Sequence, residues 1–148
     1  MVYETYSPEE TKKIAFEMGK NAVKGDIYCL SGDLGAGKTL FSKGFAAGLE
    51  IPEDDVTSPT FTIINQYDGR LTMYHFDVYR INDIWEMDDT GYEDCFFGEG
   101  VCLVEWAEMV KDIIPENAVW INIEKDLEKG DNYRKINIRG DKKWKFLH

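Results

Sequence analysis

The sequence predicts an α/β fold, a three-layer sandwich in which helices cover both faces of a mixed parallel and antiparallel central sheet. Helical and strand patterns alternate along the chain, and two short apolar runs are typical of strands buried on both faces. Two further pairs of strand-like segments flank turn residues, which indicates hairpins, one of them C-terminal. The length of 148 residues favours a single domain spanning residues 1–148.

The N-terminal part begins with a predicted helix. Ser7 and Glu10 form a capping box, a proline follows Ser7 at the favoured first helical position, and Gly25 is expected to end the helix. Residues 27–30 are continuously apolar and are interpreted as a buried strand. A glycine-rich loop follows, and the apolar spacing after it predicts a second helix over residues 38–49.

A hairpin is expected next, because β-branched and aromatic residues fill 61–67 and 71–79 on either side of an Asp-Gly turn. Residues 81–100 are acidic and aromatic, and they predict partial helix with a solvated acidic face and the aromatic side chains directed inward. An alternative interpretation makes this segment a docking surface for a basic partner. Residues 101–104 form the second continuous apolar run and are interpreted as an internal strand.

The C-terminal third predicts a short helix at 107–113 and a hairpin made of strands at 119–123 and 133–138. Residues 142–147 are expected to add an edge strand. The two continuous apolar runs should lie near the centre of the sheet, because only strands covered on both faces lack polar alternation.

The glycine-rich loop GDLGAGKT matches the pattern GxxxxGK[ST] at every fixed position. Gly32, Gly35 and Gly37 let successive backbone amides point into one hollow, at which the following helix directs its positive end. Lys38 would place its ammonium on the β- and γ-phosphates, and the Thr39 hydroxyl would ligate magnesium. The sandwich is therefore expected to be P-loop NTPase-like. ATP is the default nucleotide, since no guanine-reading NKxD motif is present.

Magnesium at such a loop needs an acidic partner, usually at the end of an apolar strand beside the P-loop strand. Glu105 directly follows the apolar run 101–104, and it is assigned to the metal, either directly or through water. Asp77 ends a segment that looks more like a hairpin arm, and it could orient the attacking water. The alternative for each is an ordinary surface carboxylate at a strand end.

Three further residues are candidates on weaker grounds. Thr60, in the loop SPTF between the second helix and the next strand, could sense the γ-phosphate, although a Ser-Pro turn explains the same letters. Trp106 follows Glu105, and it either closes the site, faces a partner or packs in the core. His75 is interpreted as structural, because its neighbours are aromatic and no second histidine lies at ligand spacing.

The composition restricts the classes of partner. The net charge is −11, from 28 acidic and 17 basic residues, which argues against unaided binding to a phosphate backbone. No apolar run approaches the roughly 20 residues of a membrane-spanning helix, so no membrane association is expected. The three cysteines lack the CxxC spacing, and a reducing cytoplasm is the simplest location.

Four segments in this order, GDLGAGKT, SPTF, YHFDVYR and VEW, resemble the TsaE (YjeE) family of bacterial P-loop ATPases over about residues 7–139. The resemblance implies an accessory ATPase that binds ATP and magnesium and hydrolyses ATP slowly unless partners stimulate it. It further implies a role with TsaB and TsaD in making threonylcarbamoyladenosine beside the tRNA anticodon, with the tRNA handled chiefly by those partners.

The resemblance also assigns roles to individual residues. It implies that Thr39 and Glu105 hold magnesium, that Asp77 and Trp106 serve hydrolysis, and that Thr60 lies in a switch-like loop. The residues that it assigns to the phosphates are Gly35, Ala36, Gly37, Lys38, Thr39 and Leu40.

Two other functions remain open at this point. A small-molecule P-loop kinase normally closes an arginine-bearing lid over the phosphates, but residues 81–100 contain seven acids and no arginine. A non-hydrolysing, nucleotide-gated adaptor would keep the same motif. No arginine finger is evident in cis, and Arg80, three residues after Asp77, is the best local candidate for a phosphate contact. Weak intrinsic turnover is therefore expected.

Overall fold

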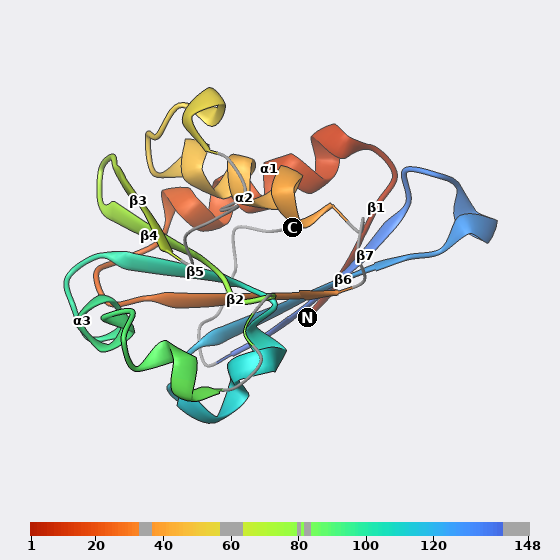
Figure 1. Ribbon diagram of the computed structural model, residues 1–148. Coiled ribbons are helices and arrows are strands. Elements are labelled where there is room, and N and C mark those ends of the chain that lie inside the picture. The colour runs from red at the N-terminus through yellow and green to blue at the C-terminus, as the bar shows by residue number, and fades with distance from the viewer. Residues whose placement is uncertain (33–36, 57–63, 80, 82–83, 141–148) are drawn as a thin grey trace.

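The computed structural model describes residues 1–32, 37–56, 64–79, 81 and 84–140, and within them the strands form one seven-stranded sheet (Figure 1). The spatial order is β1-β7-β6-β2-β5-β4-β3, so that β2 is central and β5 is its neighbour, as expected from the apolar runs. The strands are β1 (Val2–Thr5), β2 (Ile27–Gly32), β3 (Ile64–Asp68), β4 (Thr72–Asp77), β5 (Val101–Glu105), β6 (Val119–Lys125) and β7 (Arg134–Arg139).

Parallel and antiparallel pairing coexist in this sheet. The central strand β2 runs parallel to both β5 and β6, and β4 runs parallel to β5. The two predicted hairpins are the antiparallel pairs β3–β4 and β6–β7. The prediction of a mixed sheet with a C-terminal hairpin is therefore confirmed.

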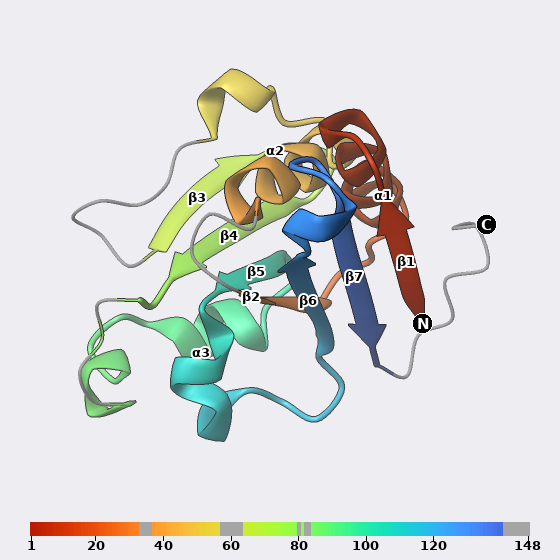
Figure 2. The same ribbon diagram turned by 90° about the vertical axis from the view of Figure 1, so that its right-hand side faces the viewer.

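Helices cover both faces of the sheet, which confirms the three-layer sandwich. The helices α1 and α2 lie side by side on one face, and α3 lies on the opposite face with η2 and η3 (Figures 1 and 2). The α-helices are α1 (Pro8–Lys20), α2 (Lys38–Gly48) and α3 (Tyr92–Phe96), and the 3₁₀ segments are η1 (Glu53–Asp55), η2 (Ile84–Met87), η3 (Ala107–Ile113) and η4 (Leu127–Lys129).

The central strands are apolar throughout because each of their faces meets a different cluster of buried side chains. Tyr28 and Leu30 of β2 pack with the residues of α1 and α2, whereas Ile27 and Cys29 pack with those of α3 and η3. The side chains of β5 alternate in the same way, and that of Leu103 faces the α1–α2 layer. Residues of odd number on β5 therefore point to the side of the sheet that α2 covers.

Glycines allow α1 and α2 to pack with their backbones almost in contact. A Cβ built on Gly48 of α2 would lie 2.2 Å from the backbone oxygen of Phe16, and one on Gly19 of α1 would lie 2.1 Å from that of Phe45. Gly44 approaches the oxygen of Lys12 in the same way, at 2.7 Å. The low helix propensity of these glycines is thus offset by close approach.

Some expected boundaries were wrong. The first helix is capped by Ser7 as expected, but it ends at Lys20 with Asn21 as its C-cap rather than at Gly25. The short helix Ala107–Ile113 is a 3₁₀ segment. The strand β1, which the sequence did not predict, pairs with β7 at one edge of the described sheet (Figure 2). The edge strand expected from residues 142–147 lies outside the described part of the chain.

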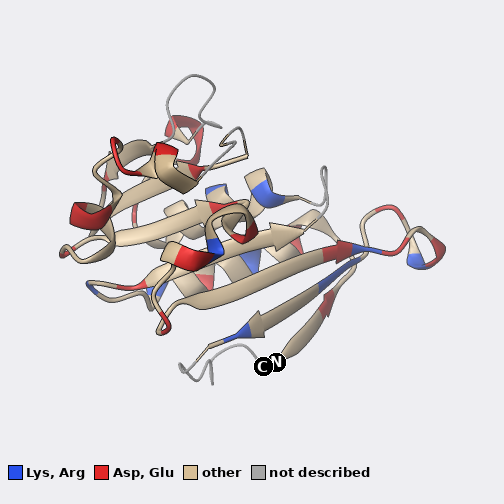
Figure 3. Ribbon diagram, turned by 60° about the horizontal axis from the view of Figure 1, so that its bottom comes forward, with Lys and Arg blue, Asp and Glu red and all other residues tan. Residues whose placement is uncertain are grey.

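The acidic segment differs in part from its prediction. Phe96 is buried at 2% exposure as expected, but Trp85 and Phe97 are 71% and 74% exposed rather than directed inward. Acidic residues are frequent along this segment, whereas Lys and Arg lie mainly elsewhere (Figure 3).

In the described residues, no helix has the length and apolarity needed to span a membrane. Burial raises the pKa of the Cys29 and Cys102 thiols well above its usual range, so both stay protonated.

Candidate nucleotide-binding site

The helix α2 begins directly after the glycine-rich loop, with Gly37 as its N-cap. Gly37 has φ 101° and ψ 26°, a left-handed conformation that glycine adopts at little cost. Its carbonyl accepts the first helical hydrogen bond, from the Phe41 amide at 3.0 Å. The first turn of α2 contains no acidic residue. The helix dipole therefore favours an anion at this end of α2.

Lys38, the first residue of α2, contacts both the end of β2 and Trp106. Its side chain is only 6% exposed, and its Nζ donates to the carbonyl of Gly32 at 2.7 Å. The same nitrogen lies 3.6 Å from the centre of the Trp106 ring, which is a cation–π contact. The ammonium therefore bridges the end of β2 and the residue that follows β5.

Two carboxylates end neighbouring parallel strands beside this lysine. Glu105 pairs in register with Leu30 of β2 on one side and with Asp77 of β4 on the other. Glu105 is 4% exposed, and Asp77 is half-buried, with its Oδ1 accepting the Tyr79 amide at 3.0 Å. Because the carboxyl ends of parallel strands meet at one edge of a sheet, both acids lie at the edge where the P-loop begins.

A histidine that the sequence interpretation treated as structural contacts one of these acids. Nε2 of His75 lies 2.5 Å from Oε2 of Glu105, and both side chains are buried. The other ring nitrogen, Nδ1, is buried and has no hydrogen-bond partner among the described residues. His75 and Asp77 are two residues apart on β4, so both side chains lie on the same face of the sheet as that of Glu105. The sequence could have indicated the contact between His75 and Glu105 only if the register between β4 and β5 had been known.

Trp106, directly after β5, has an unusual backbone conformation. Its φ is 62°, in the left-handed region that costs a non-glycine residue roughly 1–2 kcal/mol. Its amide donates to the Leu30 carbonyl at 3.1 Å, and its ring packs on Tyr79 with centroids 4.6 Å apart. Trp106 thus contacts the P-loop lysine and also packs, half-buried, against the apolar cluster on the α3 side of the sheet.

The structure brings together six of the residues expected at the site and leaves others outside its description. Gly32, Gly37, Lys38, Asp77, Glu105 and Trp106 lie around the junction of β2, α2, β4 and β5. Thr39 and Leu40 follow in the first turn of α2, where Thr39 is exposed and Leu40 half-buried. Residues outside the described part are Gly35, Ala36, Thr60 and Arg80.

The donor set of this junction fits a magnesium ion that is held together with phosphates. Glu105, Asp77 and the Thr39 hydroxyl offer oxygen ligands, which magnesium prefers. The described residues contain no cluster of three His, Cys, Asp or Glu side chains that could hold a metal alone. Magnesium commonly binds through one or two carboxylates plus substrate phosphates, so this donor set suits it.

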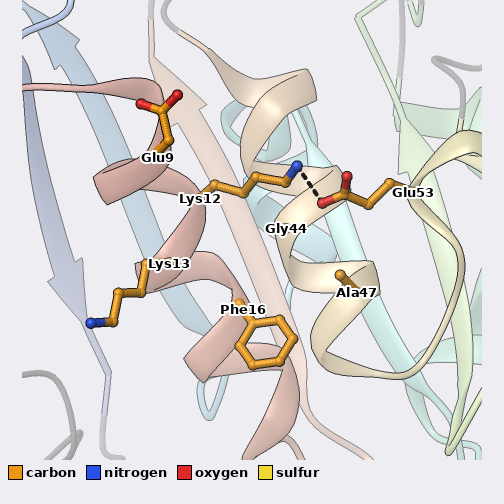
Figure 4. A pocket seen from close by; sticks show the side chains of 7 residues that line it. All are labelled: Glu9, Lys12, Lys13, Phe16, Gly44, Ala47 and Glu53. Atoms are coloured by element: carbon orange, nitrogen blue, oxygen red, sulfur yellow. Dashed lines mark ion pairs between the residues drawn. The ribbon is translucent and has the colours of Figure 1, made fainter.

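A surface hollow of about 270 Å³ lies away from this junction, between α1 and α2 (Figure 4). The ion pair between Lys12 and Glu53 crosses it. The lining residues are Glu9, Lys12, Lys13, Phe16, Gly44, Ala47 and Glu53. None of them belongs to the candidate site, so the hollow is a separate feature of the α1–α2 layer.

Comparison with known proteins assigns the chain to a family. The family described as threonylcarbamoyl adenosine biosynthesis protein TsaE matches residues 5–136, a range that includes β2, α2, β4, β5 and the β6–β7 hairpin. The chain belongs to the TsaE family. The resemblance noted from four short segments is therefore confirmed over most of the chain.

Individual relatives agree with this membership. The chain is 50% identical over 137 residues to the tRNA threonylcarbamoyladenosine biosynthesis protein TsaE of Bacillus subtilis, covering 92% of this chain and 83% of that protein. It is 44% identical over 117 residues to the TsaE protein of Treponema pallidum, covering 79% and 86%. A crystal structure of Bacillus subtilis YdiB superposes with a TM-score of 0.77 at 41% identity, over 99% of this chain and 90% of that one.

Proposed function

We propose that this TsaE-family chain binds ATP with magnesium, hydrolyses it slowly, and serves as an accessory ATPase in the biosynthesis of tRNA threonylcarbamoyladenosine. The names of its relatives support the pathway. We further propose that it acts in the cytoplasm with the TsaB–TsaD pair, which the TsaE resemblance implies, and meets tRNA through those partners. All described strands belong to one sheet, which supports a single ATPase domain.

One observation carries the ATPase proposal. Lys38 lies at the positive end of α2, while Glu105 and Asp77 end the neighbouring strands β5 and β4 in register with each other. Catalysis of phosphoryl transfer is mostly positioning and electrostatic stabilisation. It needs a cation and a helix N-terminus on one side of the phosphates and carboxylates on the other, and this site has both.

Each of these residues has a proposed task. Lys38 and the amides of α2 bind the phosphates, and Thr39 and Glu105 hold magnesium, which when bound offsets negative charge on the phosphates. Asp77 orients the attacking water. Trp106 covers the lysine and restricts water around it. We also propose roles for Gly32, Gly35, Ala36, Gly37 and Leu40 in cradling phosphates and for Thr60 in sensing the γ-phosphate.

The test is magnesium-dependent release of phosphate from ATP by the purified chain, alone and with TsaB and TsaD added. We expect a feeble rate that the partners raise, and a loss on the order of 100-fold for Lys38→Ala, because a charge that stabilises the transition state is removed. Lys43→Ala, on the same helix α2, is the matched control and should keep the wild-type rate.

Other outcomes would assign the site differently. ATP binding that Lys38→Ala abolishes, without any turnover in the presence of partners, would identify a nucleotide-gated adaptor. Transfer of the γ-phosphate to a small metabolite would identify a kinase. A phosphate release that the partners leave unchanged would contradict the proposed role in tRNA modification.

A further inference from the structure

An arginine from the far end of the chain lies beside the P-loop. Arg134 is the first residue of β7, and it pairs with Lys125 of β6 where the two strands meet the loop that connects them. The β6–β7 hairpin is seen in Figures 1 and 2. A Cβ built on Gly37, the N-cap of α2, would lie 3.8 Å from the Nε of Arg134, its nearest contact among the described residues outside the adjoining chain. The guanidinium is therefore within a few ångströms of the backbone that begins α2.

The hairpin holds this guanidinium in a defined orientation. Nη1 of Arg134 donates to the carbonyl of Asp131 at 2.9 Å and to that of Tyr133 at 2.6 Å. Tyr133 is 3% exposed, and its ring packs against Tyr6 with centroids 5.4 Å apart. The arginine is thus fixed on a packed hairpin, with Nε on the side of Gly37.

The electrostatics of this position favour an anion. The N-terminus of α2 carries partial positive charge and Lys38 adds a full one, so both attract an anion bound there. A bound phosphate would also accept charge-assisted hydrogen bonds from the Arg134 guanidinium.

We propose that Arg134 is a phosphate-binding residue of the nucleotide site, reaching the phosphates from the β6–β7 side. The inference rests on the proposed function, because it requires that the P-loop binds a nucleotide. It extends that function by supplying the arginine in cis that the sequence did not reveal. Bound phosphates would then have Arg134 on one side and Glu105, which would hold magnesium, on the other, since β7 and β6 lie on one side of β2 and β5 on the other.

The other described arginines do not compete for this role. Arg70 donates through Nη2 to the carbonyls of Gly19, Lys20 and Ala22 at the end of α1. Arg139 is exposed at the opposite end of β7, where it pairs with Trp120 at the start of β6. Arg80, the candidate chosen from the sequence, lies outside the described residues.

The test measures nucleotide affinity rather than turnover. Binding of ATP, ADP and adenosine is titrated calorimetrically for the wild type, Arg134→Gln and the matched control Arg139→Gln, in the presence of EDTA. We expect Arg134→Gln to weaken ATP and ADP by roughly tenfold to a hundredfold, as for a lost charge-assisted hydrogen bond. Adenosine affinity should not change, and Arg139→Gln should bind all three like the wild type.

Two results would overturn the proposal. ATP affinity in Arg134→Gln within twofold of the wild type would show that the arginine serves only to tether the hairpin carbonyls. An equal loss for adenosine and ATP would place the arginine at the base or ribose instead. If Lys38→Ala abolishes ATP binding while Arg134→Gln retains it, only this inference fails; if the wild type binds no ATP, the proposed function fails with it.

A second measurement uses the wild-type chain, in case Arg134→Gln does not fold. Arginines are modified with phenylglyoxal in the presence and absence of ATP, and the sites are quantified by mass spectrometry. ATP should slow modification of Arg134 and leave that of Arg139 unchanged. Equal modification of Arg134 with and without saturating ATP would contradict a phosphate contact.

Discussion

Glu105 is a carboxylate in an environment where carboxylates are uncommon. It is 4% exposed at the end of β5, and burial of a charged group is costly unless it is paired. His75 provides a partner, with Nε2 of the ring 2.5 Å from Oε2 of Glu105. A buried hydrogen bond of this kind fixes the orientation of the carboxylate, which matters for a residue that we propose to hold magnesium.

Replacing His75 should therefore weaken the metal more than the nucleotide. We expect His75→Ala to lower the affinity of the ATP complex for a divalent ion by roughly 10- to 100-fold, because the carboxylate loses the group that orients it. His75→Gln, which keeps a donor, should recover part of the loss. The affinity is measured with Mn²⁺ by electron paramagnetic resonance, and ATP binding in EDTA is measured alongside.

A purely structural role of His75 has a different signature. It would lower the melting temperature of His75→Ala and leave the Mn²⁺ affinity of the folded fraction unchanged, and that result would contradict the prediction.

The residues of the site differ in how far sequence alone could predict them. Gly37 and Lys38 follow from a contiguous motif, and Glu105 follows from the strand that it ends. His75 could not be assigned a partner, because its contact depends on the register between β4 and β5, which lie about 25 residues apart in the chain. Arg134 reaches Gly37 only because β7 joins the same sheet as β2, and no local pattern indicates that.

At the scale of elements, the packing of α1 on α2 depends on missing side chains. Gly19, Gly44 and Gly48 each place their Cα where a Cβ would come within 2.1–2.7 Å of a backbone oxygen of the facing helix. Those oxygens belong to helical backbone and cannot shift independently. The pair therefore holds α2, and with it the P-loop end of that helix, at a fixed distance from α1.

Gly48→Ala should destabilise the fold even though alanine is the better helix former. The propensity gain is about 1 kcal/mol, whereas a Cβ at 2.2 Å from the Phe16 oxygen forces the helices apart, at a cost that exceeds this gain. We expect a net loss of about 2 kcal/mol in the free energy of unfolding, measured by urea denaturation. Lys13→Ala, on the exposed side of α1, should stay within about 0.5 kcal/mol of the wild type. Equal or higher stability of Gly48→Ala would show that the helices can separate without cost.

Elements with strong local patterns could be predicted, and those defined by distant pairing could not. The strand β2 and the helix α2 follow from apolar runs and a motif that lie together in the sequence. The strand β1 has only four residues, and its register couples Val2 to Asn137 across nearly the whole chain. Residues 2–5 form an edge strand because they pair with β7, so the local pattern of the N-terminal residues could not predict this strand.

At the scale of the whole molecule, the topology gathers the site at one edge of the sheet. Parallel pairing of β4, β5 and β6 around β2 directs the ends of these strands to the same side. Residues from four separate parts of the chain, Lys38, Asp77, Glu105 and Arg134, are brought to that edge by the strand order. The site therefore requires the complete sheet, and destabilising any central strand would affect it.

The charge of the whole molecule leads to the last prediction, that the isolated chain does not bind tRNA. The net charge is −11, and residues 81–100 contain seven acids and no lysine or arginine, so the chain as a whole repels a polyanion (Figure 3). We expect a dissociation constant weaker than the roughly 10⁻⁴–10⁻⁶ M of ordinary non-specific binders at physiological salt. Filter binding of labelled tRNA at 50 and 150 mM salt measures it, with a basic tRNA-binding protein as the positive control. If tRNA is recruited only after TsaB and TsaD are added, the contact is indirect, as proposed. Micromolar binding by the chain alone that falls steeply with salt would contradict the prediction, because it would show a basic surface large enough to outweigh the net charge.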